Sequence, residues 1–199
     1  MGVARAWRNA EGVEATREFF SQRAPRGAAI RGLMREIVSE DRFARRCAAD
    51  LARRVSEREP GILRQYASVL IDLAAEAPLE DWQTRGYMTL AAARNAATRS
   101  ERMRLALPVR AMIDDERNAL RAIALEAFAL LAAGEPELRD EALAQLELAR
   151  GEGTCAMRSR ARRMLRMLLS ADASGRGGRA RQPNRMEKYV VSRRELEMK

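Results

Sequence analysis

The side chains that carry most enzyme chemistry are scarce in this sequence. It contains no histidine, and its two cysteines, Cys47 and Cys155, lie far apart. The commonest general base and metal ligand is therefore absent, and two separated cysteines do not make a zinc site. The sequence also lacks a glycine-rich phosphate-binding loop and a nucleophile elbow. We expect a protein that is not an enzyme and that holds no metal and no cofactor.

One group of acidic and aromatic residues is a candidate catalytic site, because a carboxylate beside aromatic rings can be catalytic. Asp81 is followed by Trp82, and Tyr87 comes five residues later. Adjacent residues on a helix point about 100° apart, so Asp81 and Trp82 cannot share a pocket unaided. We interpret Asp81 as a helix N-cap and Trp82 as a core residue.

Arginines near the end of the chain could bind an anion. Residues 1–153 contain 24 arginines and 24 acidic residues, so the whole net charge of +9 falls in residues 154–199. The arginines of the last predicted helix share one face without an acidic neighbour, and such a face favours an anionic partner. Guanidinium groups also pair well with phosphates. The predicted anion-binding residues are Arg158, Arg162, Arg163, Arg166, Arg176, Arg179 and Arg181. A basic tail that only interacts with solvent is the alternative.

A repeated pattern predicts the elements that carry these residues. Four arginines recur at spacings of 40, 36 and 37 residues: Arg45, Arg85, Arg121 and Arg158. This period is typical of stacked helical pairs. The offsets −1, +3, +6, +7 and +10 from each arginine lie on one helix face, and 18 of these 20 places are apolar. The pattern predicts four equivalent amphipathic helices.

We therefore expect four helical hairpins, each made of a first and a second helix. The first helices are predicted at 27–39, 61–77, 100–113 and 136–150. The second helices are predicted at 42–57, 80–97, 117–133 and 154–169. Proline and glycine fall between these segments, where they cost a helix least. Ser100 is the predicted N-cap of the first helix of the third hairpin.

At this point the third hairpin resembles a HEAT repeat. Pro108 falls within its first helix, Asp115 lies in the turn, and Arg121 opens its second helix. The resemblance implies a right-handed α-solenoid of about four HEAT-like hairpins, within an all-α fold. Some HEAT-like proteins are DNA glycosylases, but the geometry of Asp81 and Trp82 does not favour that activity. An ordinary helical bundle is the structural alternative.

The resemblance also implies that the second helices line a binding surface. The predicted partner-binding residues occupy their faces opposite the core: Arg46, Arg53, Gly86, Leu90, Ala93, Ala122 and Ala129. A partner helix with an apolar face and acidic ends would suit this surface. The alternative is that the alanines only allow close packing of the chain's own termini. We expect a noncatalytic scaffold that binds a protein; the alternative function is an accessory protein that binds nucleic acid or an anionic surface.

The division into regions follows from composition and length. We expect a capping helix in residues 1–25, a repeat body in 26–170 and a basic, largely disordered tail in 171–199, with a short ordered end left open. No apolar run is long enough to cross a membrane, and residues 1–10 contain two arginines where a signal peptide needs an apolar stretch. We expect a cytoplasmic protein.

Overall fold

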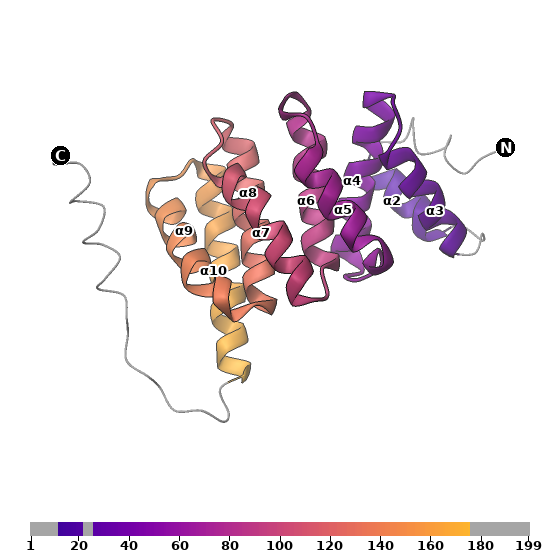
Figure 1. Ribbon diagram of the computed structural model, residues 1–199. Helices are drawn as coiled ribbons and strands as arrows, with labels where there is room; N and C mark the ends of the chain where they lie inside the picture. Colours follow the sequence, from indigo (N-terminus) through magenta and orange to yellow (C-terminus); the bar gives the residue numbers. More distant parts are fainter. Residues whose placement is uncertain (1–11, 22–25, 176–199) are drawn as a thin grey trace. The chain divides into compact units, whose positions relative to one another are not determined.

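The structure, a computed structural model, describes residues 12–21 and 26–175, and its elements within them are all helical (Figure 1). The α-helices are α2 (Gly12–Ser21), α3 (Arg26–Ile37), α4 (Arg42–Arg58), α5 (Ala67–Glu76), α6 (Trp82–Asn95), α7 (Arg99–Ile113), α8 (Asn118–Gly134), α9 (Arg139–Glu152) and α10 (Cys155–Gly175). Three short 3-10 helices precede α5, α6 and α9: η1 (Arg64–Tyr66), η2 (Leu79–Asp81) and η3 (Pro136–Leu138). The all-α prediction is confirmed.

Three details of the predicted boundaries are wrong. The helix predicted at 61–77 begins only at Ala67, as α5, after the short helix η1. The N-cap of α7 is Thr98, not Ser100, because Thr98 and Glu101 form a capping box in which each side chain accepts a hydrogen bond from the other residue's backbone. Helix α10 continues to Gly175, beyond the predicted end at residue 169. The alanine and leucine that follow residue 168 favour helix, so nothing in the local sequence ends it there.

The chain divides into two compact units, Met1–Leu168 and Leu169–Lys199. The boundary lies close to the predicted end of the repeat body at residue 170. The described part of the predicted capping segment, α2, belongs to the first unit and packs against α4. Residues 176–199, which include most of the predicted tail, lie outside the described residues.

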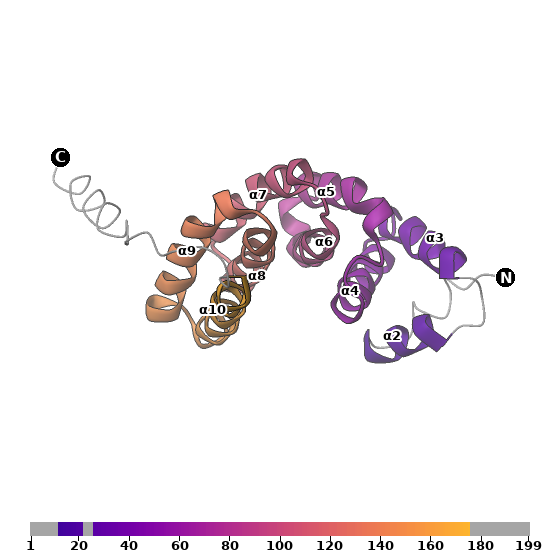
Figure 2. The ribbon, with the colours of Figure 1, turned by 90° about the horizontal axis from the view of Figure 1, so that it is seen from below.

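Within the first unit, the helices that follow α2 form two layers (Figure 2). Helices α3, α5 and α7 pack against α4, α6 and α8, which follow them in the chain. In the second layer α6 lies between α4 and α8 and contacts both. This order places the predicted second helices side by side.

The repeated apolar frame forms the core between the layers. All 20 frame positions are buried, including the polar residues Thr84 and Asn95. The Asn95 side chain accepts a hydrogen bond from the backbone amide of Leu63 at 2.7 Å and donates to Ser56 at 2.8 Å. It therefore joins α6 to α4 and to the segment before η1, and both polar atoms of this amide have hydrogen-bond partners in the core.

The recurring arginine has a structural role in three of the four predicted hairpins. Arg45 donates to the carbonyl of Ser39 at 2.9 Å, Arg85 to Ala74 at 3.3 Å, and Arg121 to Ile113 at 3.1 Å. These carbonyls lie in or just after the last turn of α3, α5 and α7, where backbone acceptors lack partners within their own helix. A cation there also interacts favourably with the helix dipole. Arg158 differs, because its partner is the thiol sulfur of Cys155.

Ion pairs join successive hairpins at the same sequence interval. Their partners are 31 to 38 residues apart, and the pairs are Arg26–Glu59, Arg45–Asp81, Arg99–Glu137, Arg104–Asp72 and Arg110–Glu141. Most are exposed and contribute little individually. Asp81 is the exception, since its side chain is 5% exposed and also accepts a hydrogen bond from Thr84.

Phe128 provides a test of the core. Its side chain is 1% exposed, so Phe128→Ala should lower the free energy of unfolding by about 3–5 kcal/mol through lost burial and the remaining cavity. The measurement is urea unfolding followed by circular dichroism. Leu107→Ala is the matched control, because Leu107 is 67% exposed and its truncation should cost little. Equal stability of the two variants would contradict this packing.

The capping box of α7 provides a test that depends on pH. Hydrogen bonds from the backbone amides of Thr98 and Ala97 lower the pKa of Glu101 below its usual value. A lowered folded-state pKa stabilises the fold above the unfolded pKa of about 4.3, and this contribution is lost as the pH falls through the folded pKa. Unfolding by urea should therefore show a stability difference between the parent and Glu101→Gln at neutral pH that shrinks below pH ~4. A difference independent of pH would argue against the ionised cap.

Candidate anion-binding site

The predicted partner-binding strip is not exposed. Its five small or apolar residues are all buried in the chain: Gly86, Leu90, Ala93, Ala122 and Ala129. A Cβ atom on Gly86 would lie 2.9 Å from the Cδ1 atom of Ile123, so α6 and α8 approach closely at this point. The strip is wrong because α6 lies between α4 and α8, and its side faces contact these neighbours. These residues allow close packing of neighbouring second helices, whereas the alternative named packing against the chain's termini, of which residues 1–11 and 176–199 lie outside the described residues.

The two arginines of the same predicted strip are half-buried and already have partners in the chain. Arg46 donates to the Gln83 side chain at 3.0 Å, and its guanidinium lies 5.5 Å from the centre of the Phe43 ring. Arg53 pairs with Asp50 at 2.7 Å and lies 5.4 Å from the Tyr87 ring centre. Both side chains therefore connect α4 with α6 at the surface of the second layer.

The predicted anion-binding arginines differ in exposure and in their partners. Arg162 and Arg166 are exposed and make no ion pair or hydrogen bond with another part of the chain that the structure describes. Arg158 is half-buried beside Cys155, while Arg163 pairs with Glu126. The other three predicted residues lie outside the described residues: Arg176, Arg179 and Arg181.

Three arginines converge on one buried carboxylate. Arg94 of α6 donates to Glu126 Oε1 at 2.7 Å, and Arg163 of α10 donates to Glu126 Oε2 at 2.8 Å. The Nε atom of Arg160, also on α10, lies 3.2 Å from the same Oε2 atom. We call Arg94, Glu126, Arg160 and Arg163 the arginine cluster. It draws on three helices of the second layer.

Exposure differs strongly across the arginine cluster. The side chains of Glu126 and Arg94 are only 6% and 9% exposed, whereas those of Arg160 and Arg163 are 31% and 51% exposed. The carboxylate and one guanidinium thus form a buried floor, and the two α10 arginines form a rim in contact with solvent. Ligands that reach this site would meet Arg160 and Arg163 first.

The cluster carries an excess of positive charge. Three guanidinium groups share one carboxylate, which leaves a net charge of about +2. Burial lowers the pKa of Arg94, and the nearby carboxylates of Glu126 and Glu57 oppose this shift. The Nη1 atom of Arg94 is buried and has no hydrogen-bond partner. Donors therefore outnumber acceptors here, which is unusual for buried polar groups.

Sequence reasoning found Arg163 but missed the rest of the cluster. Glu126 lies one helical turn after Ala122, on the predicted partner-binding face, but it was not among the predicted site residues. The available signal is spacing, because Glu126 follows Arg94 by 32 residues and precedes Arg163 by 37, both close to the repeat period. Arg160 lies three residues before Arg163 and so shares its helix face.

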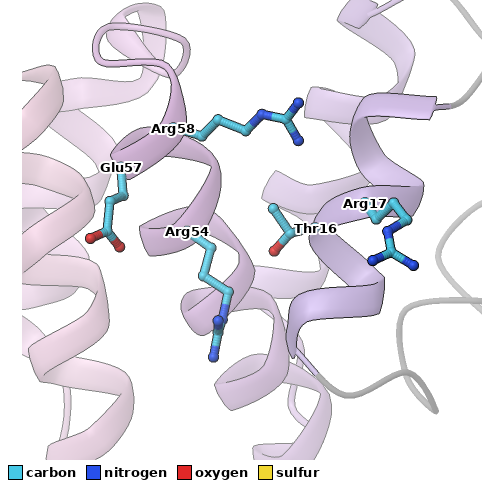
Figure 3. A pocket seen from close by; sticks show the side chains of 5 residues that line it. All are labelled: Thr16, Arg17, Arg54, Glu57 and Arg58. Carbon is cyan, nitrogen blue, oxygen red and sulfur yellow. The ribbon is translucent and has the colours of Figure 1, made fainter.

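A second group of arginines lines a hollow of about 430 Å³ between α2 and α4 (Figure 3). Its lining residues are Thr16, Arg17, Arg54, Glu57 and Arg58. Arg54 pairs with Asp50 at 2.7 Å, and the Arg58 guanidinium lies 4.3 Å from the centre of the Phe20 ring. Two of its three arginines, Arg54 and Arg58, thus have partners nearby. Unlike Arg94, neither has a buried donor that lacks a partner among the described residues.

Within residues 12–21 and 26–175, no group of three or more histidine, cysteine, aspartate or glutamate side chains could hold a metal ion. In the same part of the chain, no helix is both long and apolar enough to cross a membrane. Comparison of the chain with protein-family models, with curated proteins and with solved structures finds no match.

The burial of Leu90 within the predicted strip can be tested by mutation. Its side chain is 3% exposed, so Leu90→Glu would place a charge without a partner between packed helices and should abolish cooperative unfolding. Thermal unfolding followed by circular dichroism measures the effect. Leu79→Glu is the control, since Leu79 is 61% exposed. If Leu90→Glu kept the parent melting temperature, the strip would be a free surface after all.

Proposed function

We propose that this chain is a noncatalytic scaffold, a right-handed α-solenoid of about four HEAT-like hairpins that binds a protein partner on its second helical layer. The buried apolar frame at each repeat supports this organisation. So do the arginine bonds to the ends of α3, α5 and α7. In a solenoid, each hairpin packs on its neighbours and equivalent positions form one long surface.

The observation that carries the proposal is a row of side-chain contacts across the second layer. Arg46 contacts Gln83, Arg53 lies against Tyr87, and Arg94 and Arg163 both reach Glu126. Each contact joins neighbouring second helices at about the repeat interval. The row therefore runs across α4, α6, α8 and α10, and it presents charged and aromatic groups in place of the predicted alanine strip. Aromatic and arginine side chains are enriched in protein interfaces.

The absence of catalysis in this proposal rests on the state of Asp81. This carboxylate is buried and bonded to Arg45 and Thr84, so it is held in a structural network and is not available as a base. Trp82 packs partly against the core. Both observations support structural roles for the acidic and aromatic pair.

A second candidate function is binding of nucleic acid or an anionic surface through the basic end of the first unit. The guanidinium groups of Arg162 and Arg166 favour it, because they are exposed and pair with no group in the described part of the chain. Residues 154–168 contain five arginines and no acidic residue. Binding of this kind would weaken steeply with salt, because each neutralised phosphate releases condensed counterions.

Photo-crosslinking from defined positions tests the scaffold. Benzoylphenylalanine in place of Phe43, which is 54% exposed beside Arg46, should crosslink one discrete protein in cells that make the chain. Excess unmodified chain should compete with this product. The same group in place of Leu107, 67% exposed on α7, is the matched control and should not give it. No product from position 43, or the same product from both positions, would contradict the proposal.

A further inference from the structure

The arginine cluster has many more hydrogen-bond donors than its single carboxylate can accept. Each guanidinium carries five N–H donors, and Glu126 engages one nitrogen each from Arg94, Arg160 and Arg163. The side chains of Arg160 and Arg163 are 31% and 51% exposed, so they also have area in contact with solvent. The buried Nη1 atom of Arg94 has no hydrogen-bond partner among the residues that the structure describes. The deficit is one of acceptors.

The net charge of the cluster also favours an additional acceptor that is negatively charged. The cluster has a net charge of about +2, and its floor is shielded from water, so a nearby anion is attracted more strongly than at an exposed arginine. Arg160 and Arg163 are three residues apart on one helix face, and both reach Glu126. Two adjacent guanidinium groups held by a common carboxylate can receive a second carboxylate in bidentate geometry.

We propose that the arginine cluster is a carboxylate-binding subsite for an acidic segment of a protein partner, whose carboxylate takes the donors of Arg160 and Arg163 that Glu126 leaves unused. This inference rests on the proposed scaffold function and names the chemistry of its partner at one end of the row. The bound group is an aspartate or glutamate side chain of the partner.

The rest of the row favours a protein segment over a nucleic acid. Asp50 and Glu57 lie on α4 beside Arg53, and Glu57 is close enough to act on Arg94. Each strand of a DNA duplex carries a phosphate about every 3.4 Å of helix axis, so a duplex that follows the row would place phosphates against these carboxylates. A peptide can place one acidic residue at the cluster and neutral or basic residues farther along.

The test is a titration of the full chain with a labelled 12-residue peptide of alternating glutamate and serine, followed by fluorescence anisotropy. We expect the parent to bind this peptide and not the peptide in which glutamine replaces every glutamate. Arg163→Gln should weaken binding about ten-fold, which corresponds to the loss of one charge-assisted contact. Failure of the parent to bind the acidic peptide at low salt would overturn the proposal.

Arg166→Gln is the matched control on the same helix. It removes the same charge from an exposed side chain that has no contact with Glu126, so it should change the affinity much less than Arg163→Gln. Equal losses in the two variants would mean general electrostatic attraction and would overturn the subsite. Circular dichroism of both variants checks that the helices remain intact.

Glu126→Gln gives an effect of opposite sign. It removes the internal carboxylate, so the peptide carboxylates gain donors and the peptide should raise the melting temperature of this variant more than that of the parent. A smaller rise than in the parent would overturn the proposal. This readout compares each variant with and without peptide, so a less stable starting fold does not obscure it.

A labelled RNA strand of 12 nucleotides separates the competing class of partner. Tight RNA binding that Arg163→Gln abolishes, together with no binding of the acidic peptide, would overturn the protein assignment of the subsite. The Phe43 crosslink is independent of these titrations. If that crosslink forms while the peptide does not bind, the carboxylate subsite is wrong and the scaffold function stands. If the peptide binds as expected without any crosslink, the subsite stands and the scaffold function is wrong.

Discussion

Close approach of neighbouring second helices is the constraint on which the other features depend. At Gly86 a single added carbon would lie 2.9 Å from Ile123, and alanines fill many of the other contact positions between α6 and α8. Short side chains bring the helices near enough for longer ones at the surface to meet across them. Arg94 reaches Glu126 at 2.7 Å only because the helices are this close. The smallest residues thus set the position of the most highly charged ones.

Arginine suits this arrangement better than lysine, and the chain contains 35 arginines and two lysines. A guanidinium has donors in a fixed fork, so one side chain can serve two acceptors. Arg45 does so, because it donates to the Ser39 carbonyl and to the Asp81 carboxylate of the next hairpin. It therefore fixes the turn within its own hairpin and contacts the next hairpin at once. A lysine ammonium lacks this geometry, so Arg45→Lys would not be a conservative change.

The all-α class of the fold was predictable because the helical signal in the sequence repeats. The apolar frame around Arg45, Arg85, Arg121 and Arg158 identified four helices whose frame positions are all buried, and glycine and proline marked the breaks between segments. The binding surface was less predictable. A helical pattern shows which residues face the core, but it does not show whether the opposite face meets solvent or another helix. Leu90 and Arg94 are one turn apart on α6, yet Leu90 packs against neighbouring helices while Arg94 contributes to the cluster.

The cost of the arginine cluster to the fold is an argument for its use. Three cations around one carboxylate repel each other, and a buried guanidinium nitrogen without an acceptor destabilises the folded state. Apolar residues of similar size would fill the same space between α6, α8 and α10 without this penalty. Exposed ion pairs elsewhere in the chain match one cation with one anion. The buried carboxylates of Asp81 and Glu135 each pair with two arginines, whereas Glu126 pairs with three, two of them partly exposed. An incoming carboxylate would relieve the excess charge at Glu126.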